Sequence, residues 1–328
     1  MRPRVRQQGS PPDNLPAARR LAAARTLAVD RVTAEVVRAL RKGGIDPILL
    51  KGPALEAWTC EDERPRPYVD SDLLVAPDVL ESTQGVLRSL RFEQRLSVDE
   101  TPGGRRTSMH WTRRGDGAEI DLHVALTGVD VAPEMLWAEL DSRTVKLSVA
   151  GEAVRILAGP ARALHVSLHA AQHGPQFPGP LRDLRCALEL VAPAVWEEAA
   201  ELAARLDAVP AFAVGLRLQP EGAVVAARLD LQRPTSPETV LRAQGSVPLA
   251  LGVEAFRRLP GWRPRARMLI DELTPSPEFM RLWSGLARRG RVGLVAAYLW
   301  RPIWLLALLP RALRADARAR REAPSELN

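Results

Sequence analysis

Three aspartates in two short apolar stretches constrain the fold of this chain more than any other feature of its sequence. Asp70 and Asp72 lie in residues 69–75, and Asp121 lies in residues 119–124. Both stretches have the character of β-strands, and residues two apart on a strand point to the same face of a sheet. We therefore predict that Asp70 and Asp72 lie side by side and that a neighbouring strand brings Asp121 up to them.

Three converging carboxylates repel one another unless a hard cation lies between them. Mg²⁺ (or Mn²⁺) suits such a site, because one or two carboxylates and the phosphates of a substrate complete its octahedron. This arrangement is typical of metal-assisted phosphoryl or nucleotidyl transfer. A D-x-D pair alone is weak evidence, since acidic pairs also end strands and cap turns, so the surrounding elements matter.

A candidate phosphate-binding turn precedes the aspartates. Residues 45–50 form an apolar run, Lys51-Gly52-Pro53 follows, and residues 54–58 have a helical pattern. Gly52 allows a tight turn and the close approach of a ligand, and the free N–H groups of a helix start favour an anion. Lysine is rare here, with three residues among 46 basic ones, so Lys51 at this turn is a candidate phosphate ligand.

This order of segments resembles the uncharacterised nucleotidyltransferases of the DNA polymerase β-like superfamily, which carry a glycine turn, a D-x-D strand and a later acidic strand residue. Later segments extend the resemblance over roughly residues 40–310: the residues from His165 to His173, the segment Leu181-Arg182-Asp183-Leu184, and an apolar C-terminal stretch containing Arg301-Pro302.

The resemblance implies an α+β fold, with a mixed-sheet polymerase-β-like nucleotidyltransferase core and a helical C-terminal domain. We expect a disordered start and an N-terminal helix in residues 1–43, the core in residues 44–158 and the helical domain in residues 159–328. Hairpins are expected around residues 113–118 and 150–152, where glycine turns separate apolar runs.

The resemblance also implies roles for the three aspartates. Asp70 and Asp72 would be metal ligands, and Asp121 would be the third ligand or the base toward an acceptor hydroxyl. The implied activity is Mg²⁺-dependent transfer of a nucleoside monophosphate from a nucleoside triphosphate to an unidentified acceptor. Family members usually have Gly-Ser or Gly-Gly at the turn, so here Lys51 and backbone amides would replace the missing hydroxyl. Arg66 would neutralise phosphate or pair with a surface acid.

Three histidines recur four residues apart from residue 160 onward, where the pattern becomes helical. His165, His169 and His173 would lie along one side of a helix. They would either contact metal or phosphate, or pack at a domain interface with hydrogen bonds to carboxylates such as Asp183. A metal-dependent hydrolase built on this stripe is therefore an alternative function, and a catalytically inactive nucleotide-binding or scaffold protein is another. His123 shares a face with Asp121, where it would orient the acceptor or hydrogen-bond a carboxylate.

The net charge of +7 is concentrated at the chain ends, because residues 1–43 and residues 281–328 each hold ten basic and three acidic side chains. No aromatic series interleaves the arginines, so we expect a small-molecule, peptide or protein acceptor rather than nucleic acid. The start lacks an apolar secretory core, which predicts a cytoplasmic protein, and the bias toward Ala, Arg and Leu is typical of GC-rich bacterial genomes.

The C-terminal residues 292–309 are strongly apolar but contain Arg301-Pro302. We interpret them as a buried helix pair packed on the catalytic region rather than a transmembrane segment. A peripheral membrane contact, with the apolar face toward lipid and the flanking arginines toward headgroups, is the alternative.

Overall fold

The computed structural model describes residues 15–56, 58, 68–95, 108–232, 236–244 and 248–323. The start predicted to be disordered, residues 1–14, lies outside the described residues, as does Arg66.

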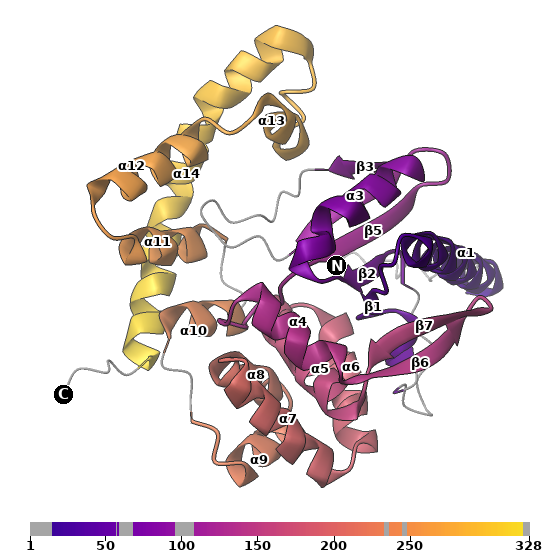
Figure 1. Ribbon diagram of the computed structural model, residues 1–328. Coiled ribbons are helices and arrows are strands. Elements are labelled where there is room, and N and C mark those ends of the chain that lie inside the picture. Colours follow the sequence, from indigo (N-terminus) through magenta and orange to yellow (C-terminus); the bar gives the residue numbers. More distant parts are fainter. Residues whose placement is uncertain are drawn as a thin grey trace, which may run out of the picture.

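A seven-stranded mixed sheet forms the centre of the molecule, in the order β3-β4-β5-β2-β1-β7-β6 (Figure 1). The strands are β1 (Ile48–Leu49), β2 (Ser71–Leu74), β3 (Phe92–Arg95), β4 (Ser108–Arg113), β5 (Ala118–His123), β6 (Thr144–Val149) and β7 (Glu152–Leu157). Strand β2 runs parallel to β5 and β1 runs parallel to β7, whereas the other neighbours are antiparallel. The two predicted hairpins, β4–β5 and β6–β7, are confirmed. The mixed sheet with its many helices confirms the α+β class.

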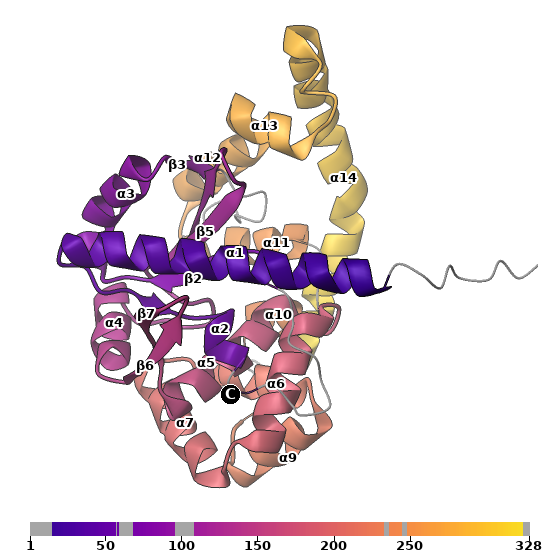
Figure 2. The ribbon, with the colours of Figure 1, turned by 90° about the vertical axis from the view of Figure 1, so that its right-hand side faces the viewer.

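One face of the sheet is covered by α1 (Leu15–Lys42) together with α3 (Leu80–Ser89), which follows the short 3₁₀ helix η1 (Pro77–Val79) (Figure 2). Buried residues of α1 such as Val36 and Leu40 form one apolar cluster with Leu73 of β2 and Ile120 of β5. The helix ends where the amides of Gly43 and Ile45 both bond the carbonyl of Leu40.

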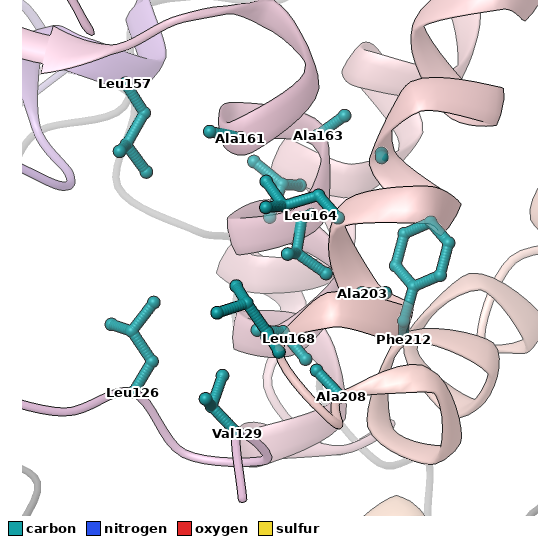
Figure 3. Close-up of a cluster of buried hydrophobic side chains, with 14 of the residues drawn as sticks. Leu126, Val129, Leu157, Ala161, Ala163, Leu164, Leu168, Ala203, Ala208 and Phe212 are labelled. Atoms are coloured by element: carbon teal, nitrogen blue, oxygen red, sulfur yellow. The ribbon is translucent and has the colours of Figure 1, made fainter. Parts of the chain in front are cut away.

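The opposite face of the sheet packs against a helical bundle whose central member is α5 (Gly159–His173). Leu164 and Leu168 of α5 lie in one apolar cluster with Phe212 of α8 (Figure 3). Leu74 of β2 belongs to the same cluster. The surrounding helices are α4 (Pro133–Asp141), α6 (Pro178–Leu190), α7 (Pro193–Arg205), α8 (Val209–Arg217) and α9 (Pro220–Arg228). Because α5 is buried over eleven residues, it fixes the bundle to the sheet.

The C-terminal helices form a separate layer beyond this bundle (Figure 1). They are α10 (Pro237–Ala243), α11 (Pro248–Arg258), α12 (Trp262–Leu273), α13 (Pro277–Trp283) and α14 (Gly290–Glu322). The predicted buried helix pair is wrong. Residues 292–309 belong to one continuous helix of 33 residues that includes Pro302 and Pro310 and extends away from the sheet (Figure 2).

Candidate functional site

The site is built on the face of the sheet that looks toward α5. In the parallel pairing of β2 with β5, Asp72 lies opposite Asp121 and Leu74 lies opposite His123. Leu74 packs in the cluster around α5. The alternation of side chains along a strand therefore places Asp72, Asp121 and His123 on the α5 side. The sequence prediction that a neighbouring strand brings Asp121 up to Asp72 is confirmed.

Asp72, Asp121 and His123 form a group that could hold a metal ion. One ligand atom of each lies within 4.8 Å of the others, and no other set of three such side chains gathers in this way within the described part of the chain. Two carboxylates and one imidazole suit Mg²⁺ or Mn²⁺ through their oxygens and a transition metal through the nitrogen. His123, predicted to orient the acceptor or to hydrogen-bond a carboxylate, thus lies among the candidate ligands.

Asp70 lies directly before β2 and is partly buried beside this group. Burial raises the pKa of its carboxyl to about 6, and the nearby charges of Asp72 and Asp121 add to the rise. These effects show that Asp70 shares the electrostatic field of the other two aspartates, as its strand position predicted. A divalent cation would offset that repulsion and favour the ionised form.

Lys51 forms an ion pair with Asp72. The Nζ atom lies 2.6 Å from Oδ1 of Asp72, whose side chain is almost fully buried. Burial alone would raise the pKa of Asp72, but Lys51 and His123 outweigh it and hold that pKa well below its usual range. Burial likewise opposes the charge on Lys51, and the attraction of Asp72 overcomes it and raises the Lys51 pKa. The ammonium therefore stays charged at the edge of the candidate metal group, where a phosphate could reach it.

The turn at Gly52 has a geometry that glycine alone suits. Its φ angle is +61°, and a Cβ atom there would lie 3.2 Å from the ring of Tyr68. The Tyr68 hydroxyl donates to Asp30 of α1 at 2.5 Å, which fixes the ring. The helix that follows, α2 (Pro53–Glu56), is four residues long. It is shorter than the predicted helix and contributes only a small dipole.

Two histidine–aspartate hydrogen bonds orient the carboxylates. His110 of β4 bonds Asp121 through Nδ1 and Oδ1 at 2.7 Å, and this bond raises the pKa of His110 despite its partial burial. His123 bonds Asp72 through Nε2 and Oδ1 at 3.2 Å. His110 was not among the predicted site residues, although a hairpin that turns at residues 113–118 pairs residue 110 with Asp121.

A cleft opens beside these residues and encloses about 560 Å³ of empty space, part of it open to solvent. The sheet side and the turn contribute Lys51, Gly52, Asp70 and Asp72, and Asp183 of α6 lines the opposite wall. Other lining residues are Leu55, Glu56, Trp58, Tyr68, Arg182 and Cys186. The cleft therefore joins the turn at Lys51 and Gly52, the D-x-D pair and the helical bundle, and Asp183 is among its lining residues.

The predicted histidine stripe lies on α5. His165 and His169 are buried, and neither Nδ1 atom has a hydrogen-bond partner among the described residues. Burial lowers the pKa of His165 to about 3 and also lowers that of His169, with Lys51 adding to both shifts. The ring of His173 contacts that of His169 edge to face at 4.6 Å. The stripe supplies no set of three clustered metal ligands within the described residues, so its geometry favours neutral packed rings over a metal site.

Most of the chain matches a known protein family. The family model of uncharacterised nucleotidyltransferases matches residues 4–221. No curated protein matches the chain. Among solved structures, the antibiotic-resistance factor ANT(2'')-Ia aligns at 16% identity with a TM-score of 0.40, covering 55% of this chain and 94% of that one. An antigenic nucleotidyltransferase-like protein from Paracoccidioides brasiliensis aligns at 16% identity with a TM-score of 0.39, covering 62% of this chain and 93% of that one.

Proposed function

Because this chain belongs to the family of uncharacterised nucleotidyltransferases, we propose that it transfers a nucleoside monophosphate from a nucleoside triphosphate to an acceptor hydroxyl, with Mg²⁺ (or Mn²⁺) as its metal. Asp70, Asp72 and Asp121 would hold the ion. A small molecule, peptide or protein is the proposed acceptor, and the cytoplasm is the proposed compartment because nucleoside triphosphates are made there.

One observation carries the proposal: Asp72 and Asp121 lie opposite each other on parallel strands, with ligand atoms of both and of His123 within 4.8 Å. When bound, a divalent cation would polarise the phosphates and neutralise their charge. The register fixes both carboxylates to the rigid centre of the sheet, so little reorganisation is needed during the reaction.

The chain's own residues would then perform three tasks. Lys51 and the backbone amides of the Gly52 turn would hold the phosphate tail. Asp121 would accept the proton of the acceptor hydroxyl as its oxygen attacks the α-phosphorus. The bond from that phosphorus to the bridging oxygen would break, and pyrophosphate would leave with its electron pair. His110 would keep the Asp121 carboxylate oriented through its 2.7 Å hydrogen bond.

Nucleotide binding and turnover can be tested separately. Thermal unfolding of the purified protein should shift upward with at least one of ATP, GTP, CTP and UTP when Mg²⁺ or Mn²⁺ is present, and much less with EDTA, because binding stabilises the folded state. Pyrophosphate release in the presence of extracts containing candidate acceptors should then identify turnover.

Asp121→Asn should lower pyrophosphate release by about 100-fold or more, the scale typical for a preorganised catalytic group. Asp271→Asn, the same chemical change at an exposed position of α12, is the matched control and should retain full activity. Unchanged turnover in Asp121→Asn would refute the assignment. Metal-dependent nucleotide binding without pyrophosphate release would support the inactive nucleotide-binding alternative, and stoichiometric zinc lost in His169→Ala would support the hydrolase.

A further inference from the structure

The long helix α14 carries an apolar stripe that faces solvent. Its positions are spaced three or four residues apart and so lie on one side of the helix: Val292, Val295, Leu299, Ile303, Leu306, Pro310 and Leu313. All seven are exposed, with 83% exposure at Val292 and 70% at Leu299. At 1.5 Å per residue the stripe is about 30 Å long, far more apolar surface than scattered surface residues provide.

The other side of α14 is occupied by contacts within the chain. Ala312 and Ala319 are buried in a cluster with Leu241 of α10 and Ala250 of α11. Nearer the start of the helix, the buried Arg301 pairs with Glu272 of α12 at 2.6 Å. Because these contacts fix the rotation of the helix, the stripe cannot turn inward without breaking them.

The charges within the segment that carries the stripe have a single sign. Between Glu278 and Asp316 the sequence contains seven arginines and no acidic residue. Exposed arginines lie at both ends of the stripe, with Arg289 and Arg291 at its start and Arg311 and Arg314 at its end. Arg318 and Arg321 continue the exposed basic surface to the end of the helix. This distribution complements an anionic surface that runs the length of the helix.

Exposed tryptophans occur on both α14 and α12. Trp300 of α14 is 51% exposed, and Trp262 at the start of α12 is 74% exposed, with Ile270 also exposed on that helix. Tryptophan is enriched at the level of lipid headgroups, where its ring is half in an apolar environment and its N–H is in a polar one.

We propose that α14 lies in the plane of an anionic lipid surface, with its apolar stripe in the outer acyl region and its arginines among the headgroups. The helix is long and apolar enough to cross a membrane by length and composition, and 17% of its most apolar stretch is buried within the protein. Crossing would place the Arg301–Glu272 ion pair near the bilayer centre, at high cost. Binding in the plane keeps that pair on the side covered by α12. This inference is independent of the nucleotidyl-transfer proposal.

The test is flotation of the full chain with vesicles of neutral phosphatidylcholine, alone or with 30% phosphatidylglycerol. The protein should float with the anionic vesicles and much less with the neutral ones, and 0.5 M NaCl should weaken binding because it screens the arginines. The triple variant R314Q/R318Q/R321Q should lower anionic-vesicle affinity by roughly 100-fold, at about tenfold or less per arginine.

The apolar contribution is tested by L299E/L306E, which places two charges in the stripe. Its matched control is L190E/V224E, which makes the same charge change at two exposed apolar residues of α6 and α9. The stripe variant should lose vesicle binding by at least about 100-fold, and the control should keep it to within about threefold.

Three results would overturn the proposal. The first is failure of the wild-type chain to float with anionic vesicles. The second is equal loss of binding in the stripe variant and its control. The third is a concentration-dependent dimer in the absence of lipid that L299E/L306E converts to monomer, since the stripe would then be covered by a second copy of the chain. Light scattering after gel filtration measures the third.

Discussion

Asp70 and Asp72 lie two residues apart and face the same site, yet removal of their charges should change stability in opposite directions. Asp72 is paired with the Lys51 ammonium, and this pairing holds the Asp72 pKa below its usual range despite burial. Asp70 has a raised pKa of about 6 because burial and the neighbouring aspartates disfavour its charge. Asparagine at each position keeps the shape and removes the charge.

Asp72→Asn should destabilise the folded protein by about 3–5 kcal/mol. The Coulomb attraction across the 2.6 Å contact is about 6 kcal/mol at an effective dielectric constant near 20. Desolvation of the pair offsets part of that attraction, but removal of one partner leaves the Lys51 ammonium without its counter-charge, which typically costs about 3–5 kcal/mol.

Asp70→Asn should stabilise the ligand-free protein at pH 7 by about 1 kcal/mol. Its pKa is about 6 in the folded protein against 3.8 unfolded, so ionisation at neutral pH costs folding free energy. The full shift corresponds to about 3 kcal/mol, and partial exposure reduces it. Because the pKa of Asp70 is raised in the folded protein, the stability gained in Asp70→Asn should be full above pH 6 and diminish as the pH falls. It should vanish below about pH 4, where the carboxyl is protonated in both the folded and the unfolded states.

Both variants can be measured by urea and thermal unfolding at pH 7 in EDTA, with Asp271→Asn as the control that should change stability by less than about 0.5 kcal/mol. At roughly 2–4 °C per kcal/mol, Asp72→Asn should melt about 6–20 °C lower and Asp70→Asn about 2–4 °C higher. Equal signs for the two variants would refute the argument that the lysine outweighs burial at Asp72 whereas burial prevails at Asp70.

The double variant Lys51→Met/Asp72→Asn should recover at least about 2 kcal/mol relative to Asp72→Asn alone, because no uncompensated charge remains; a strictly additive double variant in urea unfolding would contradict this. The buried His165 has a folded pKa of about 3, below the unfolded value of 6.5. Its contribution to the free energy of unfolding is therefore complete above pH 6.5 and falls by about 2 kcal/mol between pH 6.5 and 5. His165→Leu should flatten the pH dependence of stability over that range, and an unchanged slope would disprove this expectation. Gly52→Ala should cost at least about 1–2 kcal/mol more than Gly117→Ala and should weaken nucleotide binding in a thermal shift assay. Both glycines have positive φ angles, but only Gly52 has a ring within 4 Å of the added methyl group; equal effects would show that the ring contact is unimportant.

The sequence was enough to predict the centre of the fold and the meeting of its aspartates. The alternation that places Asp70 and Asp72 on one face is a local property of the strand. The β4–β5 hairpin was evident from its glycine turn, and in the structure this hairpin places His110 opposite Asp121. What could not be predicted was that this register gives Asp121 an imidazole partner, because the bond depends on side-chain orientation.

Two errors have different physical causes. The sequence does not predict the ion pair of Lys51 with Asp72. This pair joins the turn to a strand 21 residues later, and local sequence patterns do not indicate contacts between such distant residues. The long α14 was divided in the sequence interpretation because proline usually breaks helices. It continues through Pro302 and Pro310. The side of the helix that carries Arg301 packs against α12, so the apolar residues of the opposite side face solvent.

Strand β2, which carries Asp72, is also hydrogen-bonded to α1 on the face of the sheet away from the cleft. This contact has a practical consequence for protein engineering. On the face away from the cleft, the hydroxyls of Ser71 and Thr33 of α1 lie 2.5 Å apart in a buried hydrogen bond. A shortened version of the protein that begins after α1 would lack this bond, and it would expose Leu73 and the rest of its apolar cluster to solvent. Truncation for crystallisation should therefore remove only residues before Leu15. A fusion partner at the N-terminus should likewise leave α1 intact.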